Sequence, residues 1–288
     1  MIGAVIREAR PKQWIKNVLV FAAPAALGDL SVALVGKVAL VFVAFSLTAS
    51  GTYFWNDIKD VEADRRHPKK RLRPIASGDV PLGVARVIGS LLLVAGPVVA
   101  ALVRPQAGAV VGLYAVLTIL YSTQLKHVPI VDLAVVASGF VLRAMAGAVG
   151  TDTKMSTWFV LCTTFGSLFI VAGKRFAELL EMGEDATSTR RSLAAYTVPY
   201  LRQVLGIACT ATIVSYCLWA FENGAATDAG VPWHGLSIVP MVLALLRYLM
   251  VLEQGGGGAP EDVFTRDRSI QVYGLVWVVV YCIGVYAS

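Results

Sequence analysis

The sequence predicts an all-α fold in which a bundle of transmembrane helices forms a single domain over residues 1–288. Of the 288 residues, 57% are hydrophobic and only 15% are charged, and the mean hydropathy is +0.68. Because water-soluble domains of this length are less apolar, we expect a polytopic membrane protein. The long stretches are apolar on every face, which is typical of membrane-spanning helices and differs from the alternating strands of a transmembrane barrel.

Nine hydrophobic stretches approach the length of about 20 residues that a helix needs to cross a bilayer. The first stretch follows a basic arm and resembles a signal peptide, but Trp14 lies where interfacial aromatic residues are found, which favours a retained helix. Gly255 to Gly258 predict a spacer before the last span. The nine expected spans are residues 15–30, 35–55, 83–103, 106–122, 129–149, 156–177, 201–221, 235–252 and 270–287.

The distribution of basic residues predicts the orientation of the chain. Most of the 25 Lys and Arg residues lie in the N-terminal arm or follow the even-numbered spans. Since basic residues concentrate on the cytoplasmic side, we expect a protein of the inner (plasma) membrane with its N-terminus in the cytoplasm and its C-terminus outside. The long polar loops, residues 56–82 and 178–200, fall on the cytoplasmic side and indicate a site there. The net charge of +6 is then a topology signal, and we expect no nucleic-acid partner.

An acidic cluster follows the second span. If the helix continues past Trp55, residues Asp57, Asp60 and Asp64 lie at positions i, i+3 and i+7, so that three carboxylates share one face. Mg²⁺ prefers oxygen ligands and often completes its octahedron with substrate phosphates. The alternative is a solvated acidic loop that is paired with the basic residues after it. The predicted Mg²⁺ ligands are Asn56, Asp57, Asp60 and Asp64.

A basic run from Arg65 to Gly78 follows the acidic cluster directly. Lys and Arg side chains bind phosphate oxygens. Taken alone, this run could set the orientation of the chain in the membrane or bind lipid headgroups. Beside three aspartates, it predicts a diphosphate site in which the acids hold the metal and the bases hold phosphate. The residues that we assign to catalysis are Asp57, Asp60, Lys70 and Arg71, and Arg73 is assigned to substrate binding.

Arg143 falls near the middle of the fifth span, where an ionisable side chain is costly and is functional by default. Asp132 lies about three helical turns earlier on nearly the same face, too far away for a direct ion pair. Each side chain therefore needs a partner from another helix or from a polar cavity. Structural pairing and substrate binding are both open for Arg143.

The motifs together resemble the UbiA superfamily of intramembrane prenyltransferases. The order Asn-Asp-x-x-Asp-x-x-x-Asp from Asn56 to Asp64, the nine spans and a second polar loop after the sixth span carry this resemblance over essentially the whole chain. The chain resembles one branch of the superfamily in more detail. Members of this branch transfer a 5-phosphoribosyl group to decaprenyl phosphate. The segments that resemble this branch are Arg10–Asn17, His67–Gly78, Tyr121–His127 and Gly139–Gly147.

The second polar loop departs from the pattern of the superfamily. Typical users of prenyl diphosphates carry a second aspartate-rich motif after the sixth span, whereas here Lys174 and Arg175 precede the acids. A phosphoribosyl diphosphate has one more phosphate than a prenyl diphosphate, so the added bases favour the former donor. The alternative is a set of ion pairs at a helix end. The sequence leaves open which of Glu178, Glu181, Glu184 and Asp185 faces the site.

The resemblance implies that a 5-phosphoribosyl group moves from phosphoribosyl pyrophosphate to a polyprenyl (decaprenyl) phosphate, for cell-wall arabinan synthesis. Mg²⁺ would stabilise the charge of the departing pyrophosphate. The attacking phosphate monoester is already ionised, so no general base is required. The expected substrate-binding residues are Lys16, Asn17, Asn56, Arg73, Tyr121, Lys126, Arg143, Lys174, Arg175 and Glu178.

Two other functions remain open from the sequence. Prenyl transfer to an aromatic or quinone precursor is the commoner activity of the superfamily, and the second polar loop argues against it. A transporter would account for charged residues within spans, but we find no internal inverted repeat. Membrane lipids surround the chain in each case, and the length of the polyprenyl chain and any homo-oligomer stay undetermined.

Overall fold

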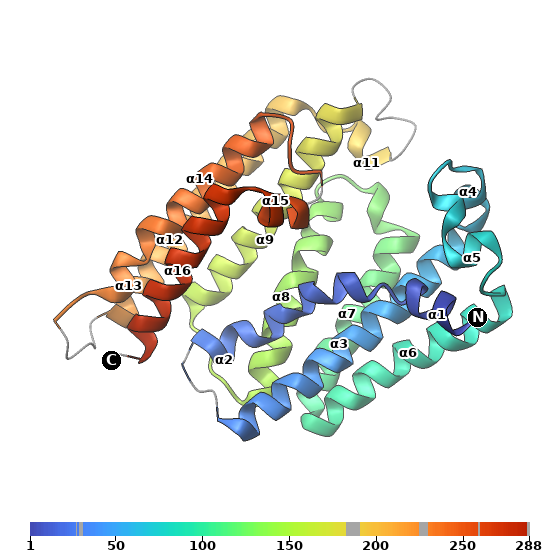
Figure 1. The fold of residues 1–288 in the computed structure, drawn as a ribbon, viewed down its shortest axis with the longest axis horizontal. Helices are drawn as coiled ribbons and strands as arrows, with labels where there is room; N and C mark the ends of the chain where they lie inside the picture. The colour runs from blue at the N-terminus through green and yellow to red at the C-terminus, as the bar shows by residue number, and fades with distance from the viewer. Residues whose placement is uncertain (27, 29–30, 183–190, 225–229, 259, 287–288) are drawn as a thin grey trace. The chain divides into compact units, whose positions relative to one another are not determined.

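The computed structural model describes residues 1–288 except 27, 29–30, 183–190, 225–229, 259 and 287–288, and its described part contains helices and no strands (Figure 1). In this part, eight helices are long and apolar enough to cross a membrane. The all-α, polytopic fold is therefore confirmed. These helices are α3 (Val32–Lys59), α6 (Leu82–Val103), α7 (Pro105–Thr123), α8 (Val131–Thr151), α9 (Thr157–Met182), α12 (Val198–Gly224), α13 with α14 (Trp233–Leu236 and Ile238–Glu253) and α16 (Arg268–Tyr286).

The shorter helices connect or precede these spans. The α-helices among them are α1 (Ile2–Glu8), α2 (Ala22–Ala26), α4 (Val61–Arg66), α5 (Pro74–Ser77), α11 (Arg191–Ala194) and α15 (Pro260–Arg266). The 3₁₀-helices are η1 (Pro11–Phe21), η2 (Lys70–Leu72) and η3 (Leu125–His127).

The first expected span, residues 15–30, is not a long α-helix in the described residues. It consists of most of η1 followed by α2. A 3₁₀-helix rises about 2.0 Å per residue and an α-helix about 1.5 Å. With these rises the described helical part of the expected span, residues 15–26, extends over about 21 Å, which is less than the hydrocarbon core of a bilayer at about 30 Å. The hydropathy pattern therefore located an apolar segment but predicted neither its helix type nor its reach.

The chain forms two compact units, and each is described by itself. The first unit comprises Met1–Leu125 and Leu142–Lys154, and the second comprises Lys126–Val141 and Met155–Ser288. Helix α8 contributes its first half to the second unit and its second half to the first.

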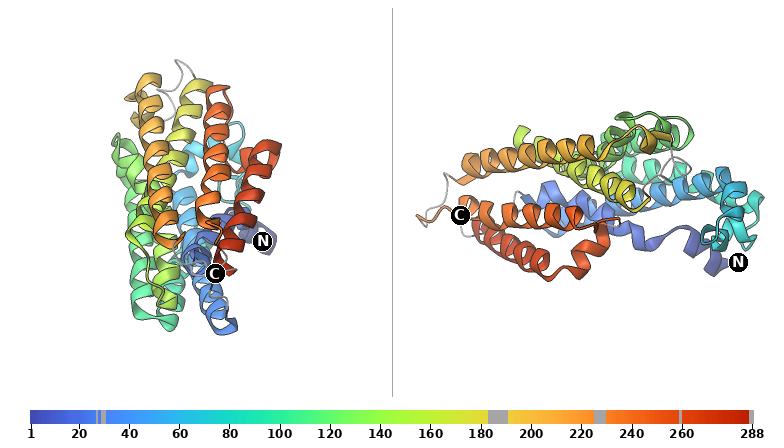
Figure 2. Two further views of the ribbon diagram at one scale, coloured as in Figure 1. Left: turned by 90° about the vertical axis from the view of Figure 1, so that its left-hand side faces the viewer. Right: turned by 90° about the horizontal axis from the view of Figure 1, so that it is seen from above.

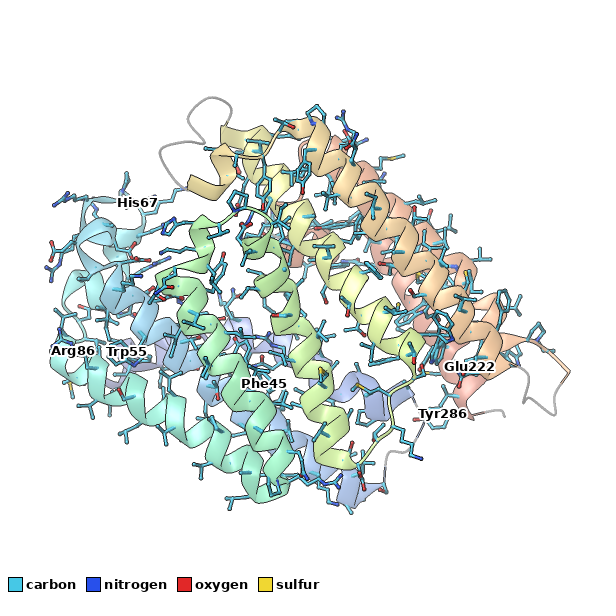
Figure 3. The ribbon with its side chains drawn as sticks, turned by 180° about the vertical axis from the view of Figure 1, so that it is seen from behind. Phe45, Trp55, His67, Arg86, Glu222 and Tyr286 are labelled. Carbon is cyan, nitrogen blue, oxygen red and sulfur yellow. The ribbon has the colours of Figure 1, made fainter. Side chains whose placement is uncertain are left out.

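In the first unit, α3 packs along α6 through small residues (Figure 1). A Cβ atom added at Gly51 would lie 2.8 Å from the Leu93 nitrogen, and one added at Gly96 would overlap the Thr48 hydroxyl. Lipid tails are as apolar as the helix surfaces, so membrane helices associate by close van der Waals contact rather than by the hydrophobic effect. Phe45, which is fully buried, lies in the interior of this unit (Figure 3).

In the second unit, α9 packs along α12 and α14 packs along α16 (Figure 2). The core contains the fully buried side chains of Phe169, Phe176 and Leu205. At the other end of α12, Trp277 donates a hydrogen bond of 2.7 Å from Nε1 to the hydroxyl of Tyr216. The same hydroxyl is hydrogen-bonded to Ser237 Oγ at 2.7 Å. Tyr216 therefore connects α12, α16 and the junction between α13 and α14.

We predict that Gly96→Ala destabilises the protein by about 1–3 kcal/mol, because the added methyl group overlaps Thr48 and forces α3 and α6 apart. Gly83→Ala, on the same helix, is the matched control, since a Cβ at Gly83 meets nothing within 4 Å. We expect this control to be neutral or slightly stabilising. Thermal unfolding in detergent measures both, and equal melting temperatures would contradict the tight packing at Gly96.

Candidate active site

The acidic cluster begins at the end of α3. The helix continues past Trp55 as predicted and ends at Lys59, and α4 begins at Val61 after the capping residue Asp60. The uninterrupted helix that would align three aspartates on one face is therefore not formed. Asp57 and Asp64 are each only 3% exposed, whereas Asp60 is half-buried at the junction.

Two arginines join the buried carboxylates Asp57 and Asp64. Arg73 Nη1 donates to Asp57 Oδ1 at 3.1 Å and to Asp64 Oδ2 at 2.6 Å. Arg10 makes a second ion pair with Asp57, and its guanidinium group lies 4.9 Å from the centre of the Tyr53 ring. The site thus brings two acids and two bases together at the end of a membrane helix.

Glu8, the last residue of α1, adds a third acid beside this pair. It is 1% exposed, it hydrogen-bonds to Asp57, and its Oε1 has no hydrogen-bond partner in the part of the chain that the structure describes. Burial, together with the negative charge of Asp57, raises the pKa of the Glu8 carboxyl from its ordinary value to about 8. No residue spacing in the sequence identifies Glu8 as part of the site. The only indication in the sequence is that Glu8 is an acid within a basic N-terminal arm.

The basic loop divides into one buried contact and several exposed side chains. Arg73 contacts the acids, whereas Lys70 and Arg71 are exposed in η2. His67 organises this turn, because its Nδ1 accepts hydrogen bonds from the backbone N–H groups of Lys69 and Lys70 at 3.1 and 3.2 Å. Lys70 and Arg71 are therefore close to Arg73 in the sequence, but their side chains are exposed to solvent and do not contact the buried acids.

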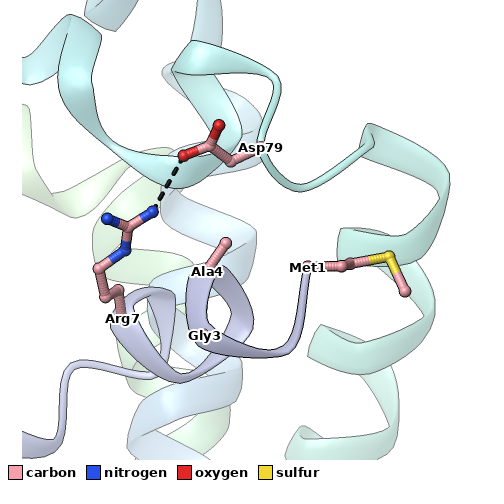
Figure 4. Close-up of a pocket in the computed structure, with 5 residues that line it drawn as sticks. All are labelled: Met1, Gly3, Ala4, Arg7 and Asp79. Atoms are coloured by element: carbon pink, nitrogen blue, oxygen red, sulfur yellow. Dashed lines mark hydrogen bonds and ion pairs between the residues drawn. The ribbon is translucent and has the colours of Figure 1, made fainter.

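A surface cavity of about 510 Å³ lies beside α1 (Figure 4). Arg7 and Asp79 form an ion pair of 3.0 Å across it, and both side chains are largely exposed. Exposed ion pairs contribute little to stability. None of the residues assigned to catalysis or to metal binding lines this cavity, so it stays separate from the acidic site.

Arg143 lies in a buried polar network of the first unit. Its Nε donates to Asn17 Oδ1 at 2.7 Å and its Nη2 donates to the Tyr114 hydroxyl at 3.1 Å. Asn17 in turn donates to Ser46 Oγ at 3.1 Å. A Cβ at Gly147, one turn after Arg143, would overlap the Val20 carbonyl. Glycine thus permits η1 to lie against α8 closely enough for Asn17 to reach Arg143.

Four other expected binding residues lie near the polar ends of helices. Lys16 is half-buried in η1, Tyr121 is half-buried in the last turns of α7, and Lys126 is half-buried in η3. Asn56 is half-buried on the face of α3 that lines a cavity with α7. Lys126 belongs to the second unit and the other three to the first.

In the second unit, Arg175 is held by two acids. Its Nε donates to Asp132 Oδ2 at 3.3 Å and its Nη1 donates to Glu178 Oε2 at 2.7 Å. Arg175 and Asp132 are 4% and 0% exposed, whereas the adjacent Lys174 is exposed. Asp132 thus has the partner from another helix that its position in the membrane requires. Glu181 is exposed, and Glu184 and Asp185 lie outside the described residues.

Tyr196 completes this network and was not identified from the sequence. Its hydroxyl donates to Asp132 Oδ1 and accepts the Ile130 backbone N–H at 2.6 Å. Ile130 has a φ of 68°, a conformation that is strained for a β-branched residue. Burial and the hydrogen bond to Asp132 raise the pKa of the Tyr196 phenol, so that it remains a donor at neutral pH. Tyr196 therefore holds the strained turn before α8 and orients Asp132.

The acids of the first unit fit a magnesium ion that takes its remaining ligands from a substrate. In the described residues, no group of three or more His, Cys, Asp or Glu side chains is arranged to hold a metal. Asp57 and Asp64 do converge on one cation, the guanidinium of Arg73. Mg²⁺ is commonly bound by one or two carboxylates together with phosphate oxygens. Two converging hard oxygen donors beside two arginines match that pattern.

The fold and the site define a polytopic membrane protein that presents paired acids and bases at the end of an early span. The model of the UbiA prenyltransferase family matches residues 17–270, and the chain belongs to this family. The family resemblance seen in the sequence is thereby confirmed.

Several proteins and structures are similar to this chain. The decaprenyl-phosphate phosphoribosyltransferase of Corynebacterium glutamicum is 44% identical and covers 99% of this chain and 88% of that protein. The protein of the same name from Mycobacterium tuberculosis H37Rv is 42% identical and covers 96% and 93%. A solved UbiA homolog from Archaeoglobus fulgidus bound to DMAPP and Mg²⁺ aligns with a TM-score of 0.73 over 99% of both chains at 13% identity, which shows a shared fold.

We predict that Glu8→Gln removes a pH dependence of stability. Because the folded-state pKa of Glu8 is raised from 4.5 to about 8, its contribution to stability is fully present below pH 4.5 and is lost as the pH rises through 8. Glutamine mimics the protonated carboxyl, so its advantage in melting temperature over the native protein should be larger at pH 8 than at pH 5. Glu62→Gln, an exposed acid, is the control. An advantage of equal size at both pH values would refute the assignment.

We predict that Tyr196→Phe destabilises the protein by about 1–3 kcal/mol, because a buried carboxylate oxygen and a backbone N–H both lose their partner. Tyr200→Phe is the control, since the Tyr200 ring stacks on Tyr196 and its phenol is more exposed. Thermal unfolding of both variants in detergent measures the difference. Equal effects of the two variants would contradict a stabilising role for the Tyr196 hydrogen bonds, because both variants keep the stacked rings and lose only a hydroxyl.

Proposed function

We propose that this chain transfers the 5-phosphoribosyl group of phosphoribosyl pyrophosphate to decaprenyl phosphate or a related polyprenyl phosphate and releases pyrophosphate. The observation that carries the proposal is the match of nearly the whole chain to relatives named decaprenyl-phosphate phosphoribosyltransferase, at 39% to 44% identity. Those names supply the donor and the acceptor. The buried acids and arginines of the first unit support the chemistry.

The reaction breaks the bond between C1 of the ribose and the pyrophosphate, and the electron pair leaves with the pyrophosphate. A phosphate oxygen of the acceptor forms the new bond to C1. Asp57 and Asp64 would hold Mg²⁺, which neutralises negative charge on the leaving group when it is bound. Arg10 and Arg73 bind phosphate oxygens of the donor in this proposal, and the exposed Lys70 and Arg71 attract the donor to the site.

The acceptor needs no general base, because a phosphate monoester loses its second proton with a pKa near 6. This agrees with a site made of acids and arginines rather than of a nucleophile and a base. We further propose that the chain lies in the plasma membrane with its N-terminus in the cytoplasm. In that orientation the acidic site faces the compartment of the water-soluble donor, while the lipid acceptor reaches it from the bilayer.

A second candidate is prenyl transfer. The digeranylgeranylglyceryl phosphate synthase of Ignicoccus hospitalis is 30% identical over 85% of this chain, so a prenyl donor deserves a direct test. Arg175 is bound to Asp132 and Glu178, whereas the adjacent Lys174 is exposed. In this proposal, the preference for a phosphoribosyl donor depends on the basic loop of the first unit. A transporter is less well supported, since Arg143 and Asp132 both have partners within their units.

We predict that purified protein with Mg²⁺, radiolabelled phosphoribosyl pyrophosphate and decaprenyl phosphate transfers label into an organic extract, and that EDTA abolishes the transfer. Asp57→Asn should lower turnover on the order of 100-fold, because stabilisation of the leaving group is lost. Asp79→Asn changes an exposed acid and should keep normal turnover. Label that stays in the aqueous phase, while a radiolabelled prenyl diphosphate reacts in a parallel sample, would favour prenyl transfer.

A further inference from the structure

A basic patch lies at the end of the first unit opposite the acidic site. It consists of Lys37, Arg104 and Lys154, which are the basic residues that follow the odd-numbered expected spans. Lys37 precedes Asp57 by 20 residues on α3, which is about 30 Å along the helix and equals the hydrocarbon core of a bilayer. Basic residues are disfavoured on this side of a membrane. Three of them there require an explanation other than the orientation of the chain.

The packing around Gly150 brings the patch together. A Cβ atom added at Gly150, near the end of α8, would lie 2.8 Å from Val41 on α3 and 3.8 Å from Val103 on α6. Lys37 lies one turn before Val41, and Arg104 directly follows Val103. Three helices thus meet at one glycine, and the basic residues lie just beyond this contact.

Arg104 has a structural role in the patch. It forms an ion pair with Asp152, and its Nη1 donates to the Val149 carbonyl at 3.4 Å. A cation at the C-terminus of a helix stabilises the carbonyl groups there, so Arg104 caps α8. Arg104 first, and then Lys37 and Lys154, hold the pKa of the Asp152 carboxyl below its ordinary value. The Asp152 carboxylate therefore lies within the field of all three cations.

The two lysines of the patch have no such structural role. In the part of the chain that the structure describes, Lys37 and Lys154 make no hydrogen bond or ion pair, and both are exposed. Asp152 is the one acid among the described residues at this end of the unit, and it is already the partner of Arg104. Three positive charges thus stand against one negative charge, so the patch attracts an anion.

An apolar stripe on α6 leads to this patch. It consists of Leu91, Val94, Val98 and Leu102, which are 53% to 82% exposed and whose spacing of three or four residues places them on one face of the helix. The stripe is about 17 Å long at the rise of an α-helix, which is about half the hydrocarbon core and therefore one leaflet. It ends two residues before Arg104. A molecule with an anionic headgroup and apolar chains of one leaflet's length matches both features.

We propose that the basic patch binds the phosphate headgroup of an anionic phospholipid whose acyl chains lie along the α6 stripe. The headgroup contacts Lys37 and Lys154, and the ion pair between Arg104 and Asp152 stays intact. A water-soluble anion would satisfy the lysines but leave the stripe without a role. In the proposed orientation of the chain, the lipid belongs to the outer leaflet. The site is separate from the proposed reaction, so neither depends on the other.

Quenching by brominated phospholipids measures lipid binding at this place without turnover. Leu102→Trp adds a fluorophore at the end of the stripe, and the native protein in the same bilayers corrects for its six tryptophans. Brominated phosphatidylglycerol should bind there about 10-fold more strongly than brominated phosphatidylcholine. Phe221→Trp is the matched control, because Phe221 is 65% exposed on α12 and no Lys or Arg occurs from residue 203 to 246. It should show no preference.

The same assay tests the charges of the patch. Lys37→Gln and Lys154→Gln, added to Leu102→Trp, should reduce the preference to that of the Phe221→Trp control, whereas Lys37→Arg with Lys154→Arg should keep it. Asp152→Asn should increase the preference, because it removes the negative charge of the patch. Asparagine tolerates the φ of 61° at this position. High salt should weaken the preference, since the charges are exposed.

Four outcomes would overturn the site. Equal quenching by the two lipids in Leu102→Trp would show that the patch does not select anionic headgroups. A preference that persists in the double glutamine variant would show that the lysines do not bind the headgroup. Loss of the preference in inorganic phosphate, compared with chloride at the same ionic strength, would indicate a site for a soluble anion. Stronger competition by decaprenyl phosphate than by phosphatidylglycerol would assign the patch to a polyprenyl lipid instead.

Discussion

The ion pairs that Arg10 and Arg73 make with Asp57 and Asp64 are the interaction on which the first unit depends. They connect the N-terminal arm, the end of α3, α4 and the loop before α5. Removing one partner of a buried ion pair typically costs 3–5 kcal/mol, because the remaining charge stays buried. In the proposed function, the two acids among these four side chains would hold the metal and the two arginines would bind the diphosphate.

Hydropathy and charge predicted the fold well because a bilayer imposes length and polarity on every span. Eight of the expected spans are helices of membrane-spanning length, and the acidic and basic runs do meet, through Arg73. The sequence could not predict the break at Asp60, since one capping residue leaves the spacing of the aspartates unchanged. It also could not predict Arg10 as the partner of Asp57 or Tyr196 as the partner of Asp132, because these pairs are 47 and 64 positions apart.

The charged residues within spans follow one physical rule, although they lie in different units. Arg143 is bound by the amide of Asn17 and the phenol of Tyr114, and Arg175 is bound by two carboxylates. Each arrangement supplies hydrogen bonds that water would otherwise provide. Asn17 and Tyr114 lie on other helices than Arg143, and Asp132 lies on another helix than Arg175, so these side chains connect the helices of their unit.

The exposure of the arginines separates binding groups from structural ones. The side chains of Arg10 and Arg73 are 30% exposed while their aspartate partners are 4% exposed, so each guanidinium has an exposed face on which a phosphate can bind without exchange of its buried carboxylate. The side chains of Arg175 and Asp132 are 5% and 0% exposed, and an exchange there would leave Asp132 as a buried, uncompensated charge. In the proposed function, these exposed faces of Arg10 and Arg73 would bind the phosphates of the donor. Arg175 instead holds α8 and α9 together through its ion pair with Asp132.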